Sequence, residues 1–414
     1  MRRLALVAAA AALAAGCAPR APLAPARGQP VVRVGVVVDA PAGTFSATGQ
    51  YWVVGADGSI LASVDSGVTW RAEPGDGPDR IRLVRPDRPA PDQVASPVTV
   101  RPLKPADMVV IAGHRYRGEA TVLRGSAGVT IANRVPLEWY VQAVTAAELG
   151  VGDPAARQAV LAQAVASRTF ALHFLGRREA LGFDLYATVA DQVYPGAEGE
   201  RPQVTADVAA TAGQIVVWHG QPIEALYHST CGWSTEAADL VFRNAPRVPY
   251  LREVSDRYGP GKRDYYCAAS PSFRWTEAWD AGSLDSILAR TLPSALGPAA
   301  HLGAVTNIRV AATTPTGRVE SLVVTTTSGA DTVPSYQVRD VLRPAPDRQL
   351  LSTLFQLYVQ RQGGQVVKVT AAGAGSGHGV GMCQWGAIGR ARAGQDYVRI
   401  LATYYPGTRL VRLY

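Results

Sequence analysis

The sequence predicts an α+β protein in which a central pair of helices flanks a substrate groove. Three observations predict this class. Alternating apolar runs fill the first third of the chain, two segments with helical periodicity follow at about 136–149 and 154–176, and strands mixed with short helices occupy the rest. Of the 414 residues, 47% are hydrophobic and 18% charged, which is a globular composition and excludes a disordered protein.

The N-terminus is predicted to be an export signal. "MRRLALVAAAAALAAGC" has two arginines, a short apolar stretch and small residues before Cys17, and it is too short for a stable membrane span. The ending resembles a bacterial lipobox, in which Cys17 is lipidated. Ala14 replaces the usual leucine, so simple export with cleavage nearby is the alternative. We expect a signal peptide over residues 1–17 and a Pro/Ala tether over 18–30, with the protein in the cell envelope, anchored to the membrane through Cys17.

The charge pattern argues against a nucleic-acid partner. The net charge of +8 comes from scattered arginines, and no Lys/Arg block of the kind found in a nucleic-acid-binding arm is present. A diffuse basic surface suits an anionic partner such as a cell envelope. A genome that prefers Arg to Lys explains the same charge equally well.

Two regions are expected after the tether. Residues 31–125 read as a mostly β part, in which Asp57-Gly58 between two alternating runs predicts a hairpin. Residues 126–414 are expected to form the second region, which contains the candidate site residues. In it, "GQIVVWHGQPIEALYHS" predicts a second hairpin, turning at His219 to Pro222, whose second strand ends at His228. The strand "GQVVKVTAAG" then leads into a Gly-rich loop and a closing helix.

The two central helices have recognisable starts. The first is expected to begin at Pro136, a favourable first-turn residue, and to end near Gly150. The second is expected to begin with Asp153 as its N-cap and Pro154 in its first turn.

Glu148 falls on the apolar face of the first helix. It follows Leu137, Val141 and Val144 by 11, 7 and 4 residues, which are same-face spacings for a period of 3.6. Burial disfavours the charged form of a carboxyl and raises its pKa, which keeps it protonated near neutrality as a general acid requires. The alternative is a glutamate at the rim that reaches solvent or pairs with Arg168, which shares an apolar face of the second helix, for structure alone.

Two polar loops are further candidates for the site. "YHSTCGWSTE" places His228 and Ser229 at a strand end, and "SGHGVGMCQWGA" places His378 and Gln384 in a Gly-rich loop that allows close approach of a ligand. The second loop lacks the Gly-Lys-Ser/Thr of a phosphate loop and does not fit the dinucleotide fingerprint. The alternative is a tight strand-to-helix connection that binds nothing.

Three cysteines remain after Cys17. In an oxidising compartment one disulfide and one free thiol are expected, and Cys231 and Cys267 are the favoured pair because they lie closest in sequence, which leaves Cys383 free. A Cys-His nucleophile or a His/Cys metal site built from His228 or His378 is a minor alternative. We expect no metal and no cofactor.

The combination of these segments closely resembles the stage II sporulation protein D (SpoIID/LytB) family over roughly residue 32 to the C-terminus. The segments that carry the resemblance are "VPLEWYVQAVTAAELG", "AVLAQAVASRTFAL", "DQVYPG", "IEALYHSTCGWSTE", "PYLREVSD", "GHGVGMCQWGAIGRARAG" and "ILATYYPGT". The resemblance implies activity on peptidoglycan, in the best understood members lytic transglycosylation with one glutamate as acid and base. That glutamate is Glu148 here; Arg168 occupies the "A-x-R-T" position, and the two histidine motifs correspond to His228 and His378.

The sequence also departs from the family pattern. Some members have His and Cys zinc ligands before the "Q-x-Y" segment, and "YATVADQVY" has none, so the resemblance implies no zinc here. Serines common in the two motifs are Cys231 and Cys383, and a tyrosine is Trp385. We expect these changes to alter substrate details and to leave the family assignment intact.

The residues are compatible with a lytic mechanism. Hydrolytic glycosidases normally need two carboxylates, whereas the motif loops contain no second Asp or Glu apart from Glu236. We expect Glu148 to protonate the glycosidic oxygen, Arg168 to orient it or bind substrate, and His228 and His378 to hold the glycan by hydrogen bonds. The alternative is a non-catalytic wall-binding protein or a modulator of cell-wall amidases, as the LytB branch suggests; the presence of both Glu148 and Arg168 favours an enzyme.

Overall fold

The computed structural model describes residues 28–86, 92–150, 152–261 and 264–414. The expected signal peptide, Cys17 and the tether up to residue 27 lie outside these ranges, so the structure does not test them. Within the described ranges, no helix combines the length and the apolar character needed to cross a bilayer.

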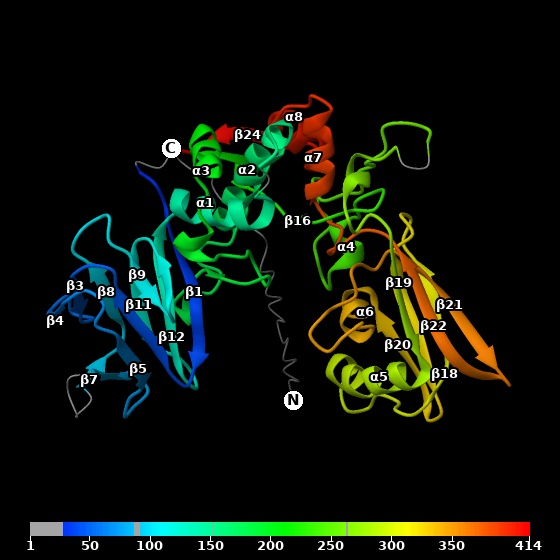
Figure 1. Ribbon diagram of the computed structural model, residues 1–414, viewed down its shortest axis with the longest axis horizontal. Coiled ribbons are helices and arrows are strands. Elements are labelled where there is room, and N and C mark those ends of the chain that lie inside the picture. Colours follow the sequence, from blue (N-terminus) through cyan, green and yellow to red (C-terminus); the bar gives the residue numbers. More distant parts are fainter. Residues whose placement is uncertain (1–27, 87–91, 151, 262–263) are drawn as a thin grey trace, which may run out of the picture.

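Two β-rich lobes lie on either side of a helical layer that joins them (Figure 1). The first lobe is formed by the N-terminal strands and the second by a segment in the last third of the chain. The joining layer contains α1, α2, α3, α7 and α8, so helices from the middle of the sequence pack against helices from its end.

The first lobe consists of two antiparallel sheets that share one apolar core. The orders are β13-β1-β12-β11-β8-β3-β4 and β10-β9-β2-β5-β6-β7, and only the short β13 runs parallel to its neighbour. The strands are β1 (Val31–Ala40), β2 (Gly43–Ala47), β3 (Tyr51–Val54), β4 (Ile60–Val64), β5 (Trp70–Pro74), β6 (Arg80–Val84), β7 (Asp92–Ala95), β8 (Val98–Pro102), β9 (Val109–Ile111), β10 (His114–Tyr116), β11 (Glu119–Arg124), β12 (Val129–Pro136) and β13 (Leu185–Tyr186).

The helical layer continues the same core. Two small sheets, β15-β14-β24 and β16-β23, border it. Its elements are α1 (Leu137–Leu149), the 3-10 turn η1 (Pro154–Ala156), α2 (Arg157–His173), η2 (Glu179–Leu181), η3 (Gly196–Gly199), α3 (Pro202–Ala210), β14 (Gln214–Trp218), β15 (Gln221–Pro222), β16 (Tyr227–His228), α4 (Ala238–Val241), η4 (Tyr266–Ala269), β23 (Met382–Cys383), α7 (Gln384–Arg392), α8 (Tyr397–Tyr404) and β24 (Arg409–Arg412).

The second lobe has an apolar core of its own. Two three-stranded antiparallel sheets, β17-β22-β21 and β18-β19-β20, pack with α5 and α6. The elements are β17 (Trp275–Asp280), α5 (Ala281–Leu296), β18 (Val305–Thr313), β19 (Val319–Thr326), β20 (Gly329–Pro334), α6 (Ser335–Val341), β21 (Phe355–Gln362) and β22 (Gln365–Gly373). The region that the sequence analysis treated as one catalytic unit therefore contains a second core.

The α+β class is confirmed, and so are two local predictions. The hairpin at Asp57-Gly58 forms between β3 and β4, and the helix after Pro136 ends at Leu149. The second helix begins later than expected, because Pro154 opens a single 3-10 turn capped by Asp153 before α2 starts at Arg157. The groove expected beside the helical pair stays a prediction.

The second hairpin is shorter than predicted. β14 pairs with β15 only as far as Pro222, and the residues Tyr227 and His228 leave that hairpin to form β16. β16 then pairs in parallel with β23, so that Tyr227 lies opposite Met382 and His228 opposite Cys383. The two predicted loops are thereby joined by backbone hydrogen bonds.

Candidate functional site

Glu148 lies in the last turn of α1, on the side that faces the protein. Leu137, Val141 and Val144 of the same face are fully buried, and Glu148 is half-buried. The carbonyl end of a helix carries partial negative charge, which disfavours an ionised carboxyl there. The periodicity in the sequence therefore predicted the orientation of Glu148 correctly.

Three polar groups contact the Glu148 carboxyl. The Val193 N–H donates to Oε1 (3.1 Å), the Gln384 side-chain amide donates to Oε2 (3.4 Å), and the Tyr227 hydroxyl is the third donor. Burial raises the pKa of Glu148 above its ordinary value, and these hydrogen bonds lower it by less. The carboxyl is thus biased toward its protonated form while donors are in place for the carboxylate.

A chain of buried polar side chains supports these donors. Gln192 accepts from the Tyr140 hydroxyl (2.8 Å) and donates to the Tyr227 oxygen (2.9 Å). Gln163, fully buried on α2, donates to Ser167 (3.0 Å) and accepts from Gln384 (3.4 Å). The sequence analysis did not single out these residues, although a signal existed: Gln163 and Ser167 are four residues apart in the mostly apolar middle of α2.

Two glycines of the Gly-rich loop lie in close contact with neighbouring segments of the protein. Gly377 and Gly381 have φ of +98° and +71°, a region that side chains rarely adopt. A Cβ at Gly377 would lie 2.8 Å from the His228 Cβ, and one at Gly381 would lie 2.1 Å from the Leu226 carbonyl oxygen. These two glycines therefore fit the alternative of a tight connection, which brings Gln384 to Glu148.

The two motif histidines are held by backbone groups. His378 Nε2 donates to the Tyr227 carbonyl (2.9 Å) and its Nδ1 accepts from the Val380 N–H (3.1 Å). Burial, with the charges of Arg339 and Arg318, lowers the pKa of His378 to about 4. The expectation that His378 holds a glycan is corrected, because both ring nitrogens are already engaged.

In His228, only one of the two ring nitrogens has a hydrogen-bond partner among the described residues. Its Nδ1 donates to the Val380 carbonyl (3.1 Å), and its buried Nε2 has no hydrogen-bond partner among the described residues. Burial lowers the pKa of His228 well below its ordinary value, so the ring is neutral. Ser229 is half-buried beside it, its hydroxyl 3.3 Å from the Thr230 hydroxyl and its carbonyl accepting from the Trp385 N–H (3.0 Å).

Arg168 does not orient Glu148. Its guanidinium is fully buried and bidentate to Glu138, at the opposite end of α1, with N···O distances of 2.8 and 2.7 Å. The Tyr414 hydroxyl and the Gly213 N–H also donate to Glu138. Burial acts to raise the pKa of Glu138, but Arg168 and these donors together lower it. The sequence analysis placed Arg168 correctly on an inner face and chose the wrong partner.

Glu236 is a structural carboxylate. It is buried, and its oxygens accept from the Thr314 and Thr316 hydroxyls and from the Ala237 N–H. These contacts occupy both carboxylate oxygens. Glu148, by contrast, is only partly buried and has a raised pKa, two features that suit a general acid and base.

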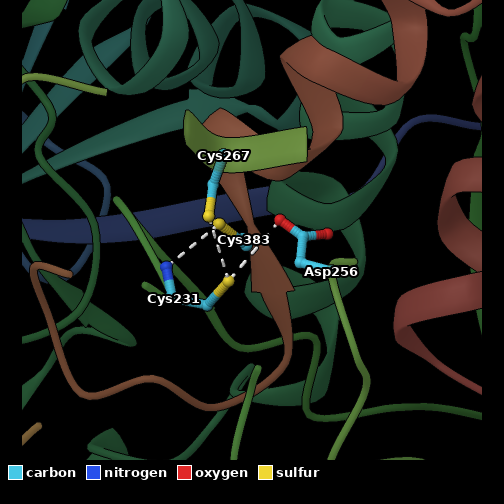
Figure 2. A group of neighbouring side chains, drawn as sticks. All are labelled: Cys231, Asp256, Cys267 and Cys383. Carbon is cyan, nitrogen blue, oxygen red and sulfur yellow. Dashed lines mark hydrogen bonds between the residues drawn. The ribbon is translucent and has the colours of Figure 1, made fainter. Parts of the chain in front are cut away.

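The three cysteines meet at one point rather than forming one disulfide and one free thiol. Cys231, Cys267 and Cys383 are all buried free thiols, and their sulfur atoms lie within 4.8 Å of one another and of an Asp256 carboxylate oxygen (Figure 2). The expected Cys231–Cys267 bond is absent, because these Sγ atoms are 3.5 Å apart. No simple pattern marks this cluster in the sequence, since its members are spread over residues 231–383.

Comparison with known proteins gives two family matches. A family described as Stage II sporulation protein matches residues 125–218, which include Glu148. A family described as a domain of unknown function, DUF8618, matches residues 260–381, which include the second lobe.

Comparison with individual proteins gives several relatives, one of which carries the name of the first family. An uncharacterised protein of Brachyspira hyodysenteriae is 30% identical over 74% of this chain and 74% of its own. Stage II sporulation protein D of Bacillus subtilis is 29% identical over 67% of this chain and 74% of its own. The amidase enhancer of Bacillus subtilis is 26% identical over 68% of this chain and 39% of its own.

Proposed function

Since the chain belongs to the stage II sporulation protein D (SpoIID/LytB) family, we propose that it cuts peptidoglycan glycan strands as a lytic transglycosylase. The family placement supports a peptidoglycan-related function. The observation that carries the finer proposal is the half-buried Glu148 carboxyl, whose pKa is raised by burial and which faces donors from Val193 and Gln384.

The proposed reaction needs one carboxyl. Protonated Glu148 gives its proton to the glycosidic oxygen, the bond from that oxygen to the anomeric carbon breaks, and an oxocarbenium-like sugar forms. The sugar's own 6-hydroxyl oxygen then bonds to the anomeric carbon, and the Glu148 carboxylate takes its proton. The product is a 1,6-anhydro-muramoyl end, and no water is consumed.

The residues around Glu148 suit both halves of this cycle. Burial favours the protonated acid at the start, and the donors from Val193, Gln384 and Tyr227 stabilise the carboxylate after the proton has left. Gln384 is itself buried and contacts both Glu148 and Gln163, so its amide is oriented before substrate arrives. Such preorganisation is the expected contribution of the fold to the rate.

We also propose that the protein works outside the cytoplasm, on the wall-facing side of a membrane. The basis is the sequence of residues 1–17, which ends in Cys17, and the Pro/Ala-rich segment that follows. A lipid anchor on Cys17 and a tether would hold the catalytic region within reach of the wall.

The runner-up function is a non-catalytic modulator of a peptidoglycan amidase. The specific observation in its favour is the amidase enhancer of Bacillus subtilis among the relatives, at 26% identity. On this alternative, Glu148 and its donors form a polar core without chemistry.

Digestion of purified cell walls separates the two functions. The protein is incubated with walls alone and with walls plus a cell-wall amidase, and the soluble fragments are identified by mass spectrometry. The proposal expects 1,6-anhydro-muramoyl ends from the protein alone. Reducing ends would indicate a hydrolase instead, and faster amidase release without any new glycan ends would establish the modulator.

A further inference from the structure

The cluster of three cysteines and Asp256 draws on four separate parts of the chain. Cys231 lies in the loop after β16, Cys267 lies in η4, and Cys383 ends β23, while Asp256 comes from the segment between (Figure 2). Cys231 Sγ is 3.5 Å from Cys267 Sγ and 3.5 Å from Asp256 Oδ2. All four residues are fully buried.

These distances match a tetrahedral zinc site. Zn–S bonds of about 2.3 Å place two sulfur ligands about 3.8 Å apart at a tetrahedral centre, and Zn–O bonds of about 2.0 Å bring an oxygen slightly closer. The ligand atoms here all lie within 4.8 Å of one another, so small side-chain movements would suffice to close them around an ion. Soft thiolates favour zinc over the hard cations that carboxylates alone would bind.

Several contacts around the cluster would suit negatively charged sulfur atoms, although Cys383 Sγ also contacts the Ser229 carbonyl oxygen (3.8 Å). The Cys231 and Gly386 N–H groups donate to Cys383 Sγ at 3.1 and 3.2 Å, as backbone donors do to thiolates. Arg390 donates to Asp256 Oδ1 (3.1 Å), so a guanidinium lies beside the carboxylate that would be the fourth ligand. Such outer contacts orient metal ligands and offset their charge.

Arg318 adds a second, independent observation. It is 1% exposed, and its Nη2 donates to the Cys231 carbonyl oxygen (2.9 Å). Its Nε and Nη1 atoms are buried and have no hydrogen-bond partner among the described residues. A buried guanidinium with free donors is costly unless negative charge lies nearby; Glu236 supplies part of that charge, and thiolates in the cluster would add to it. Three thiolates, one carboxylate and one Zn²⁺ carry a net charge of −2, which Arg318 and Arg390 offset.

We propose that Cys231, Cys267, Cys383 and Asp256 bind one structural zinc ion. Four protein ligands in a fully buried position leave no open coordination place, which characterises structural rather than catalytic zinc. Binding displaces the thiol protons to solvent, and a site that exists only in the folded chain stabilises the fold. The proposal departs from the expectation of no metal, which considered the segment before "Q-x-Y" and histidine-based ligands.

The ion would fix the loop that places Gln384 beside Glu148. Gln384 directly follows Cys383, and its side chain contacts Glu148 across 3.4 Å. Zinc would tie this loop to the Cys231 loop and to η4, three segments that otherwise meet through hydrogen bonds. The metal claim stands without the proposed enzymatic function, because its test measures zinc and not activity.

Metal content decides the proposal. The full chain carrying Cys17→Ser, which removes the fourth cysteine, is purified without chelator and examined by elemental analysis and native mass spectrometry. We expect about one zinc ion per chain, and three thiols that react with an alkylating reagent only after denaturation with chelator.

In the Cys267→Ser variant, zinc affinity should fall on the order of 100-fold or more, because even changes to residues that only contact metal ligands cost about 10–100-fold. Ser270→Ala, three residues away, should keep the zinc.

A second measurement does not depend on whether the Cys267→Ser variant folds. Cobalt is exchanged for zinc in the Cys17→Ser chain, and thiolate-to-cobalt charge-transfer absorption is expected because sulfur ligands produce it. Three outcomes would overturn the proposal: no zinc together with a single reactive thiol, which indicates a disulfide; no zinc with three reactive thiols; or zinc retained equally by Cys267→Ser. Cobalt bound without charge-transfer absorption would exclude the cysteines as ligands.

Discussion

The side-chain amide of Gln384 donates to Glu148 Oε2 across 3.4 Å, although 236 residues separate the two in sequence. The contact exists because β23 pairs with β16 and delivers α7, which begins at Gln384, to the end of α1. The same amide also contacts the Glu148 carbonyl oxygen (3.3 Å), so it binds the helix end as well as the side chain. The proton affinity of Glu148 therefore depends on a distant loop.

Replacing Gln384 by leucine should move the pH dependence of activity. The Gln384 hydrogen bond favours the carboxylate, so its loss raises the pKa of Glu148 further. The basic limb of kcat/KM, where the protonated acid is lost, should shift to higher pH by about 0.4–1 unit, the equivalent of one ordinary hydrogen bond. Gln395→Leu, the same change further along the chain after α7, is the control and should leave the limb in place. A limb that stays fixed or moves to lower pH in Gln384→Leu contradicts this role.

Replacing Arg168 by methionine should reduce stability and leave the chemistry intact. The change leaves the buried Glu138 carboxylate without its ion-pair partner, which should lower the free energy of unfolding by about 3–5 kcal/mol. Urea unfolding measures the loss. The double variant Arg168→Met/Glu138→Leu should recover most of it, because no uncompensated charge remains. The opposite result, full stability with kcat/KM lost per folded molecule, would return Arg168 to the catalytic site.

Replacing Cys17 by serine should release the protein from membranes. The prediction follows from the lipobox-like ending of residues 1–17, since the lipid would be attached to the Cys17 thiol. Fractionation of cells with an antibody against the catalytic region measures it. Unchanged membrane retention with an uncleaved N-terminus would refute the lipoprotein, and release of the wild type into the medium would support simple export.

The helical periodicity of the sequence predicted the inward orientation of Glu148, because the face of a helix on which a residue lies is a local property. Glu148, Val144 and Val141 share one face of one helix, and that face can be read from spacing alone. The same reasoning failed for Arg168. α2 is buried on every side from Ala159 to Ala171, so its apolar pattern does not reveal which neighbour a polar residue meets.

Contacts between segments that are far apart in the sequence could not be predicted either. The pairing of Cys231 with Cys267 was inferred from proximity in sequence, whereas the parallel pairing of β16 with β23 brings Cys383 into the same cluster. The separate core of the second lobe was missed for a related reason: its strands alternate with short helices and resemble a continuation of the preceding region. Tertiary pairing decides both features, and neither leaves a periodic signal.

The rate at which Glu148→Gln releases 1,6-anhydro-muramoyl ends from purified walls tests the central claim most directly. Glutamine keeps the size and much of the hydrogen bonding but cannot cycle a proton. Burial raises the pKa of the Glu148 carboxyl, so its charged form destabilises the folded protein at neutral pH. Because glutamine carries no charge, the stability of the variant at neutral pH should equal or exceed that of the wild type. With fold and wall binding retained, the rate should fall about 10²–10⁴-fold. Release of anhydro ends at the wild-type rate would contradict the mechanism.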